Sequence, residues 1–524
     1  MWLKITPLLL STVLVCLPLY GLAKPLRLAN QGDATSMDPH SLQESFQLSF
    51  LGNIYEPLVT RGRNFELEPC LATSWKAVNG TTWRFELRQG VKFQDGSPFT
   101  ADDVLFNLER TRAESADTKL YVSQIKEIRK LNAHSIEIVT LSPYPLLPSI
   151  LTGWLQMSRS WAEQHEAQIP LNSKSGKTNY ATMHANGTGP FVLKTRQPGV
   201  RTILANNPGW WGRAEHNLTE VVFTPIGNAA TRMAALVSGE IDVMEPVPLQ
   251  DVERIKADPA LRVVQGPELR TLFLGLDMFR DELLFSNIKG KNPLKDRRVR
   301  QALYQAIDIE AIRLKIMRGA ALPAGVLLAP GVHGYEASFD QRLAYDQGAA
   351  KQLLSQAGYP AGFELGLRCP NDRYVNDADI CQAVAAMWTR VGVKTQLTTE
   401  TKTLYLPKVL KSEVSAYLLG WQPAGNDTHN TLWTVLNTQT ATGQGQFNVG
   451  RYSNPKLDEL TQRMGVEVDT DKRQALVREA WGLVAQDMPV LPLHSQMLAW
   501  GVRRNIDLHL QPDNNSPLRY ITGR

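Results

Sequence analysis

The sequence predicts an α/β fold of two or three domains, and two observations support this. The chain has 524 residues, which is too many for one ordinary hydrophobic core. Along much of its length, strand-like and helix-like stretches alternate. This order is typical of parallel sheets whose faces are covered by helices.

The first 23 residues are predicted to be a cleaved export signal. Lys4 is the only charged residue before Lys24, residues 8–17 are mostly apolar, and Gly21 and Ala23 are small residues at the cleavage positions. An uncleaved membrane anchor is the alternative. It is less favoured because two prolines interrupt a segment that is short for a spanning helix.

Residues 82–108 combine three local signals in a row. Residues 82–88 alternate between apolar and mostly charged side chains, which predicts a half-buried strand. Two turns that contain glycine follow. Thr100 and Asp103 then have the spacing of a capping box, so a helix is predicted to begin there.

Other elements surround this stretch in the first part of the chain. A strand at residues 25–30 ends in a loop that contains Asp33, and strand ends of this kind often face ligands. A core-facing helix is predicted at residues 45–55 and a further strand at residues 135–140. Residues 169–187 are polar and indicate a surface loop.

The next elements predict a parallel crossover. A strand at residues 221–225, a helix at residues 229–237 and a strand at residues 241–244 follow one another. Gly239 stands where the helix is expected to stop. A strand, a helix and a second strand in this order join two parallel strands.

A second group of alternating elements follows, and an apolar strand comes close to the C-terminus. The predicted elements are a helix from Asp346 to Gly358, a strand at 363–367, a helix at 378–391, a strand at 393–398, a helix at 404–410 and strands at 415–421 and 497–502. This alternation indicates a second α/β domain.

The cysteines fit an oxidising compartment without requiring one. Beyond the predicted signal, the chain has Cys70, Cys369 and Cys381. Cys369 and Cys381 could form a disulfide that closes a short loop, or could remain reduced. Cys70 is expected to be a small buried apolar side chain. Neither the cysteines nor the scattered histidines have the spacing of a zinc site, so no cofactor is predicted.

Charge and motifs argue against two classes of protein. Lys and Arg number 56 against 51 Asp and Glu, mixed along the chain, so nucleic acid is not expected as a partner. There is no GxSxG nucleophile elbow, no GxGxxG dinucleotide motif and no complete P-loop. The sequence therefore predicts a protein that is not an enzyme.

Several motifs resemble those of the family 5 extracellular solute-binding proteins, the periplasmic receptors of peptide and nickel importers. The resemblance runs from about Lys24 to the end of the chain. Gln89 departs from it, because the family usually has a charged residue there. The motifs are carried, in the family's order, by residues 55–59, 82–108, 187–193, 207–211, 239–243 and 296–308.

The resemblance implies a two-lobed periplasmic binding protein of the class with an extra N-terminal subdomain, whose lobes are joined by a two-segment hinge. Lobe I would comprise residues 24–276, with an inserted subdomain at about 59–188, and would be completed by residues 495–524. Lobe II would comprise residues 277–494. Closure around the hinge would bury the ligand and create a surface that an importer recognises.

The first predicted ligand site is the polar loop that contains Arg373 and Tyr374. An arginine can hold a carboxylate through two parallel hydrogen bonds. In dipeptide-binding members of the family, an arginine at the matching position receives the peptide C-terminus, so the resemblance assigns this role to Arg373. A solvated ion pair with Asp372 or Asp377 is the alternative.

The second predicted site follows Trp421, which matches a family tryptophan at the ligand-facing end of a strand. Its indole offers a flat apolar wall and one N–H donor. Peptide binders commonly carry an aspartate three residues later that pairs with the α-ammonium, but this chain has Ala424. Either Asp427 next to Asn426, Asp33 or another acid takes that role, or the ligand has no ammonium there. Asp427 could also be structural.

The resemblance therefore predicts a monomeric periplasmic substrate-binding protein that captures short peptides or peptide-like carboxylates. It would deliver them to the permease and ATPase complex of an ABC transporter in the inner membrane. One alternative is the same fold with a nickel chelate, an opine-like compound or an oligosaccharide as ligand. Another is a signalling receptor or an exported hydrolase on this scaffold.

Overall fold

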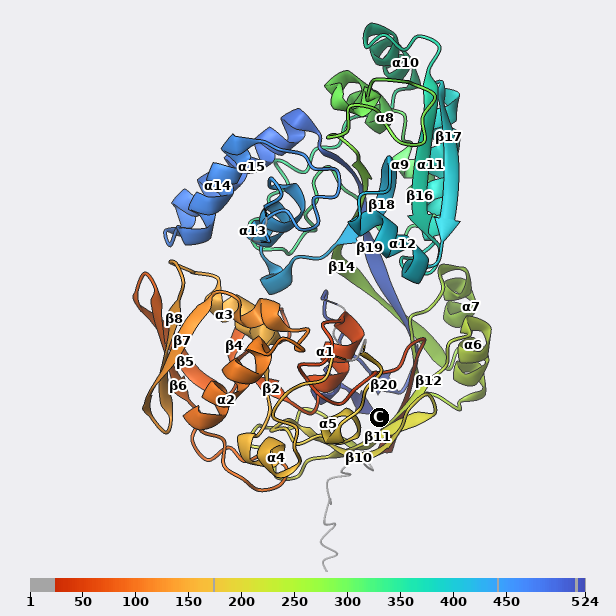
Figure 1. Ribbon diagram of the computed structural model, residues 1–524. Helices are drawn as coiled ribbons and strands as arrows, with labels where there is room; N and C mark the ends of the chain where they lie inside the picture. Colours follow the sequence, from red (N-terminus) through yellow and green to blue (C-terminus); the bar gives the residue numbers. More distant parts are fainter. Residues whose placement is uncertain (1–23, 173–174, 441–442, 514–516, 524) are drawn as a thin grey trace, which may run out of the picture.

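The computed structural model describes residues 24–172, 175–440, 443–513 and 517–523, and they form two lobes (Figure 1). Lobe I contains the N-terminal half of the chain, and lobe II contains most of the rest. The predicted export signal lies outside the described residues. Among the described helices, none combines the length and the apolar character that a membrane span requires.

One sheet of 11 strands runs through both lobes in the order β10-β11-β12-β1-β13-β19-β14-β18-β16-β17, with β15 paired to β19. Its strands are β1 (Lys24–Asn30), β10 (Phe191–Gln197), β11 (Arg201–Asn206), β12 (Leu218–Pro225), β13 (Val243–Glu245), β14 (Leu261–Leu276), β15 (Ala321–Pro323), β16 (Phe363–Pro370), β17 (Val393–Glu400), β18 (Ala416–Trp421) and β19 (Val490–Arg503).

The predicted parallel crossover is confirmed in lobe I. Strand β1 pairs in parallel with β12 on one side and with β13 on the other, and α6 (Ala229–Ser238) connects these two neighbours. Helix α6 ends at Gly239, whose φ is 81°, a left-handed conformation that glycine adopts without steric cost.

Strands β14 and β19 run from one lobe into the other (Figure 1). They pair antiparallel, and their register breaks between Pro267 and Thr271. Only beyond this break does β14 also pair with β18 of lobe II. We propose that the lobes hinge at this break, a few residues before the predicted boundary at 276. The other predicted boundary lies at 494–495. Ser495 of β19 pairs with Thr271 of β14, so this boundary lies beside the same break.

The inserted subdomain is built on a four-stranded antiparallel sheet of order β5-β6-β8-β7. The capping box predicted at the start of its helix is confirmed, because the backbone N–H of Thr100 donates to Asp103 at 2.9 Å and the Thr100 hydroxyl accepts from the backbone. Its elements are β5 (Ala72–Asn79), β6 (Thr82–Leu87), α2 (Ala101–Arg112), β7 (Ile125–Asn132), β8 (Ser135–Thr140) and α3 (Leu147–Ile150).

Short elements complete lobe I around this sheet. The helix predicted at residues 45–55 is confirmed in part, because α1 ends at Leu51. The elements are α1 (Ser45–Leu51), β2 (Glu56–Pro57), β3 (Val59–Arg61), β4 (Leu67–Pro69), β9 (Leu155–Gln156), α4 (Arg159–Gln164), α5 (Tyr180–Met183), α7 (Val252–Ala257), β20 (Ile506–Asp507) and β21 (Thr522–Gly523).

Lobe II contains the predicted α/β elements and a helical pair that sequence reasoning missed. The missed pair, α14 and α15, buries Leu457, Leu460 and Trp481 in a core shared with strands β14 and β18. The helices are α8 (Arg297–Gln305), α9 (Ile309–Ala311), α10 (Gln347–Gln356), α11 (Asp377–Arg390), α12 (Lys402–Leu410), α13 (Thr428–Thr431), α14 (Pro455–Val466) and α15 (Thr470–Asp487).

Candidate ligand-binding site

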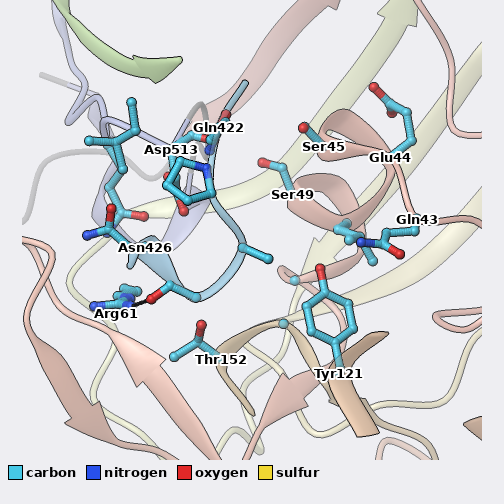
Figure 2. Close-up of a pocket in the computed structure, with 18 of the residues that line it drawn as sticks. Gln43, Glu44, Ser45, Ser49, Arg61, Tyr121, Thr152, Gln422, Asn426 and Asp513 are labelled. Atoms are coloured by element: carbon cyan, nitrogen blue, oxygen red, sulfur yellow. Dashed lines mark hydrogen bonds between the residues drawn. The ribbon is translucent and has the colours of Figure 1, made fainter. Parts of the chain in front are cut away.

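A cavity of about 540 Å³ lies where the two lobes meet (Figure 2). Its walls come from α1 and the end of β3 in lobe I, from the loops after β16 and β18 in lobe II, and from the C-terminal segment. Small-molecule sites in proteins usually measure about 300 to 1,000 Å³. The cavity is therefore large enough for a ligand of several residues.

The loop between β16 and α11 is fixed by covalent and polar contacts. Cys369 and Cys381 are joined by a disulfide, with their Cα atoms 6.6 Å apart, so the pairing that the sequence left open is formed. The Asp377 carboxylate accepts hydrogen bonds from the backbone N–H groups of Arg373 and Tyr374, both at 2.9 Å. These contacts hold the loop backbone and leave the Arg373 side chain to the cavity.

Arg373 and Tyr374 both line the cavity. The Arg373 guanidinium lies 5.3 Å from the centre of the Tyr374 ring, and no carboxylate among the described residues forms an ion pair with it. The alternative ion pairs are absent, because Asp377 binds the loop backbone and Asp372 accepts from the backbone of Lys402. An exposed guanidinium of this kind can receive a ligand carboxylate through two hydrogen bonds.

Trp421 lies at the cavity-facing end of β18, next to this loop. The hydroxyl of Tyr374 accepts a hydrogen bond of 2.9 Å from the backbone N–H of Gly420. The Trp421 ring packs on Phe447, with centroids 5.1 Å apart, and both residues line the cavity. Its indole N–H is buried and has no hydrogen-bond partner among the described residues. The ring itself gives the cavity wall an apolar surface.

The loop after Trp421 connects the two lobes through Arg61. From the end of β3 in lobe I, the Arg61 guanidinium donates to the backbone oxygen of Gly425 in lobe II at 3.0 Å and to the Ser149 hydroxyl at 2.6 Å (Figure 2). Ser149 also donates to the Gly425 oxygen. Ala424 and Asn426 line the cavity beside this contact. The loop thus joins lobe II to the inserted subdomain.

Replacing Arg61 with alanine is expected to open the lobes. Hydrogen bonds from a charged donor contribute about 1.5 to 3 kcal/mol, and the bond from Arg61 to Gly425 exists only in the arrangement in which lobe II touches lobe I. Small-angle scattering of the ligand-free variant should give a larger radius of gyration than that of the parent protein.

Arg63→Ala is the matched control for this experiment. Arg63 is an exposed arginine two residues further on, and its partner Glu215 lies in the same lobe. Its removal should leave the radius of gyration unchanged. Equal dimensions for both variants would show that the Arg61 contact does not hold the lobes together.

The contacts of Asp427 favour the structural role that the sequence left open beside a ligand contact. Asp427 does not line the cavity and is 2% exposed. Its carboxylate accepts from Arg473 at 2.6 Å and from His333 at 3.0 Å. Burial alone would raise the pKa of Asp427, but the hydrogen bonds from these two residues outweigh it and lower the pKa. Asp427 also caps the start of α13.

Asp33, another acid predicted to contact the ligand, is engaged within lobe I. Its carboxylate accepts from Arg196 at 2.8 Å and from the backbone N–H of Gly199 at 2.8 Å. It is not among the residues that line the cavity. The loop after β1 is therefore held to strand β10 and its turn.

Three other carboxylates line the cavity, and sequence reasoning did not select them for binding. They are Glu44, Glu56 and Asp513. Glu44 caps α1, because it accepts from the backbone N–H of Gln47 at 3.0 Å. Asp513 lies in the C-terminal segment, where its backbone oxygen accepts from the Gln422 side chain at 3.2 Å.

Glu56 is fully engaged within lobe I. It accepts hydrogen bonds from Trp210 at 3.0 Å, from Trp211 at 2.7 Å and from the Thr188 hydroxyl at 2.8 Å. Burial raises the pKa of Glu56, although these bonds oppose the shift. The motif residues 55–59, 187–193 and 207–211 are thus brought together around one carboxylate.

Two further arginines, Arg270 and Arg519, line the cavity. Arg270 pairs with Glu268 at 3.1 Å and donates to the Gln422 side chain at 3.1 Å. Arg519 donates to the backbone oxygen of Arg61 and to the Tyr520 hydroxyl. A search of the described residues finds no group of three His, Cys, Asp or Glu side chains that could hold a metal ion.

The two-lobed fold and its interlobe cavity define a solute-binding protein. The family model named "Bacterial extracellular solute-binding proteins, family 5 Middle" matches residues 66–443. The chain belongs to this family. Its members are periplasmic solute-binding proteins of ABC importers, and this chain is accordingly a binding protein and not an enzyme.

Curated relatives and solved structures match over most of the chain. Heme-binding protein A of Haemophilus influenzae is 28% identical over 82% of this chain and 79% of its own length. The dipeptide-binding protein of Escherichia coli is 26% identical over 92% and 91%. The structure of DppA from Helicobacter pylori in complex with the peptide STSA has a TM-score of 0.78 and 26% identity, covering 95% of this chain and 97% of that one.

Proposed function

We propose that the protein captures short peptides or peptide-like carboxylates between its lobes and delivers them to an ABC importer in the inner membrane. The observation that carries this proposal is Arg373, a cavity-lining guanidinium without an ion pair among the described residues. It lies beside Trp421 and Phe447, which form an apolar aromatic wall. A carboxylate and the body of a peptide match these two features.

The ligands named for similar proteins support the same class. Relatives include a dipeptide-binding protein, a murein peptide-binding protein and glutathione-binding proteins. The ligands in these names share an amide backbone with at least one free carboxylate. In this proposal, the protein acts as a monomer in the periplasm after its export signal is removed, and the hinge in β14 and β19 closes the lobes on the ligand.

Calorimetry with a ligand panel tests this function. Di- to pentapeptides should bind more tightly than sugars or nickel chelates, and at least one peptide should bind with a Kd in the micromolar range or below. Mass spectrometry of molecules that co-purify with the protein should identify the same class. Peptides that bind no better than sugars and chelates would overturn the proposal.

Heme is a second candidate, favoured by the similarity to heme-binding protein A. Protein ligands of heme iron are mainly His, Met, Cys and Tyr side chains. The described cavity lining contains no His or Met, and its one cysteine, Cys70, is buried with a pKa that burial raises well above its usual value. Of its two tyrosines, Tyr374 accepts a hydrogen bond from the backbone of Gly420, and burial raises the pKa of Tyr121 to about 12. These features favour the peptide class. Titration with hemin, followed by its absorption spectrum, distinguishes the two candidates.

A further inference from the structure

We propose that Arg270 binds a second carboxylate of the ligand, beside the one that Arg373 receives. The preferred ligands are then short peptides with an acidic side chain near the C-terminus. This role of Arg270 rests on the proposed function, because it assumes a peptide whose C-terminal carboxylate binds Arg373. It narrows the substrate class of the same cavity from peptides in general to acidic peptides.

Arg270 and Arg373 are both neighbours of Tyr374. The Arg373 guanidinium lies 5.3 Å from the centre of the Tyr374 ring. A Cβ atom on Gly420 would meet Cε1 of Tyr374 at 2.8 Å and Cδ of Arg270 at 3.2 Å, so both side chains pass over this glycine. All four residues line the cavity. The absence of a side chain at Gly420 thus lets two arginines reach the cavity wall at the end of β18.

The Arg270 guanidinium is held in place through two of its nitrogens, and the third remains for a ligand. Its Nε donates to Glu268 at 3.1 Å, and its Nη2 donates to the Gln422 side chain at 3.1 Å. Nη1 donates to no described residue, and it is not among the buried side-chain atoms left without a partner. It is therefore accessible from the cavity and can donate to a carboxylate while the pair with Glu268 stays intact.

Two carboxylates compete with a ligand for the charge of Arg270. Burial alone would lower the pKa of Arg270, but Glu268 and, more weakly, Glu44 help to outweigh it, and the pKa is raised. Glu268 does not line the cavity, and it also accepts a hydrogen bond from Gln496. Glu44 caps α1 in the wall across from Gln422 and forms no ion pair with Arg270 (Figure 2). A ligand carboxylate that reaches Nη1 therefore replaces only a long-range attraction.

The charges of the cavity wall favour an anionic ligand. Among the described residues that line the cavity, four are arginines and three are acids. Burial raises the pKa of one of these acids, Glu56. The loop after Trp421 adds no acid to the wall, because Ala424 and Asn426 are uncharged. A ligand with two carboxylates should therefore gain more from this wall than a ligand with one.

The experiment compares acidic peptides with uncharged peptides of the same shape. Calorimetry at neutral pH measures Ala-Ala-Glu against Ala-Ala-Gln, and Ala-Glu-Ala against Ala-Gln-Ala. In at least one pair, the acidic peptide should bind the parent protein about tenfold or more tightly, the effect of one charge-assisted hydrogen bond. Acidic peptides that bind no more tightly than their amides would overturn the inference while leaving the proposed function intact. If no peptide of any kind binds the parent protein, it is the proposed function that fails.

Substitutions then test whether Arg270 carries the preference. Arg270→Gln is combined with Glu268→Gln, so that no buried carboxylate is left without its partner. This double variant should bind both members of a pair with affinities that agree within about twofold. Glu268→Gln alone keeps the guanidinium and should keep the preference for the acidic peptide. A double variant that retains the preference would overturn the inference, because the second carboxylate would then bind elsewhere.

Arg519→Gln is the matched control, because it removes another arginine that lines the cavity. It should keep the parent's preference for the acidic peptide. Arg270→Lys retains the charge without the planar fork and should show a smaller preference than the parent, which keeps the test open if the double variant does not fold. Circular dichroism spectra identical to that of the parent would confirm that each variant folds.

Discussion

Replacing Arg373 with alanine is expected to lower the affinity for peptides with a free C-terminus by about 10- to 100-fold. The estimate follows from the 1.5 to 3 kcal/mol that hydrogen bonds to charged groups contribute, and a bidentate pair lies at its upper end. Because Arg373 is exposed at the cavity wall and its loop is held by Asp377 and a disulfide, the fold should survive the change. Calorimetry at constant pH measures the effect.

Two comparisons make this result specific. Arg373→Lys keeps the charge but loses the planar fork, so it should recover only part of the affinity. Amidation of the peptide C-terminus should weaken binding to the parent protein. It should have little effect on the already weakened binding to the Arg373→Ala variant. Arg390→Ala, at the exposed end of α11, is the control and should bind like the parent. Unchanged affinity of Arg373→Ala would remove the proposed carboxylate site.

The elements that could be predicted from the sequence are those that local chemistry determines. Thr100 and Asp103 stand three residues apart, and this spacing allows them to form the capping box at the start of α2. Gly239 stops α6 because it adopts a positive φ without strain. Strand β8 was predicted with the same bounds, 135–140, and its Ile136 and Ile138 lie in the core of the subdomain. The capping box and the helix stop depend on residues that are close in sequence, whereas β8 also pairs with the distant strand β6.

The contacts of the acids predicted for the candidate site depend on partners far away in the sequence. Asp33 is neutralised by Arg196, and Asp427 by Arg473, and no pattern in the sequence connects either pair. Asp513 lies in an irregular segment that only tertiary contacts with Gln422 and Leu269 bring to the cavity. Arg373, Tyr374, Trp421 and Asn426 were located because a family resemblance supplied their place in the fold.

Lowering the pH from 6.5 to 4 is expected to destabilise the protein strongly. Three histidines are fully buried in their neutral form, chiefly because burial disfavours the charged ring: the pKa is lowered to about 3 for His40 and to about 4 for His429 and His494. In the unfolded chain each would titrate near 6.5. Below that pH the unfolded state therefore binds more protons than the folded state, and stability falls as the pH falls.

The buried Glu245 carboxyl makes stability depend on pH in the opposite direction to the three histidines, so stability has its maximum between the two effects. Burial raises its pKa to about 8, so the folded state takes up a proton between pH 8 and about 4.5 while the unfolded carboxylate remains charged. Stability should thus fall as the pH rises from 6.5 to 8. Between pH 6.5 and 4.5, unfolding lets the three histidines take up three protons and makes Glu245 release one. From these four groups, the unfolded state therefore binds two protons more than the folded state. Because Glu56, whose pKa burial also raises, acts in the same direction as Glu245, the free energy of unfolding should then decrease by less than about 3 kcal/mol per pH unit.

His494→Leu tests this account at one residue. His494 lies in the hinge strand β19, is completely buried, and has no partner for either ring nitrogen among the described residues. Its replacement removes a proton-binding group without breaking a side-chain hydrogen bond to any described residue. Denaturant unfolding measures the free energy of unfolding of the variant minus that of the parent. This difference should be about 2 kcal/mol more positive at pH 5 than at pH 7. His184→Gln, at an exposed position, should follow the parent at both pH values. A parallel pH profile for His494→Leu and the parent would mean that this histidine gains no proton when the protein unfolds in acid.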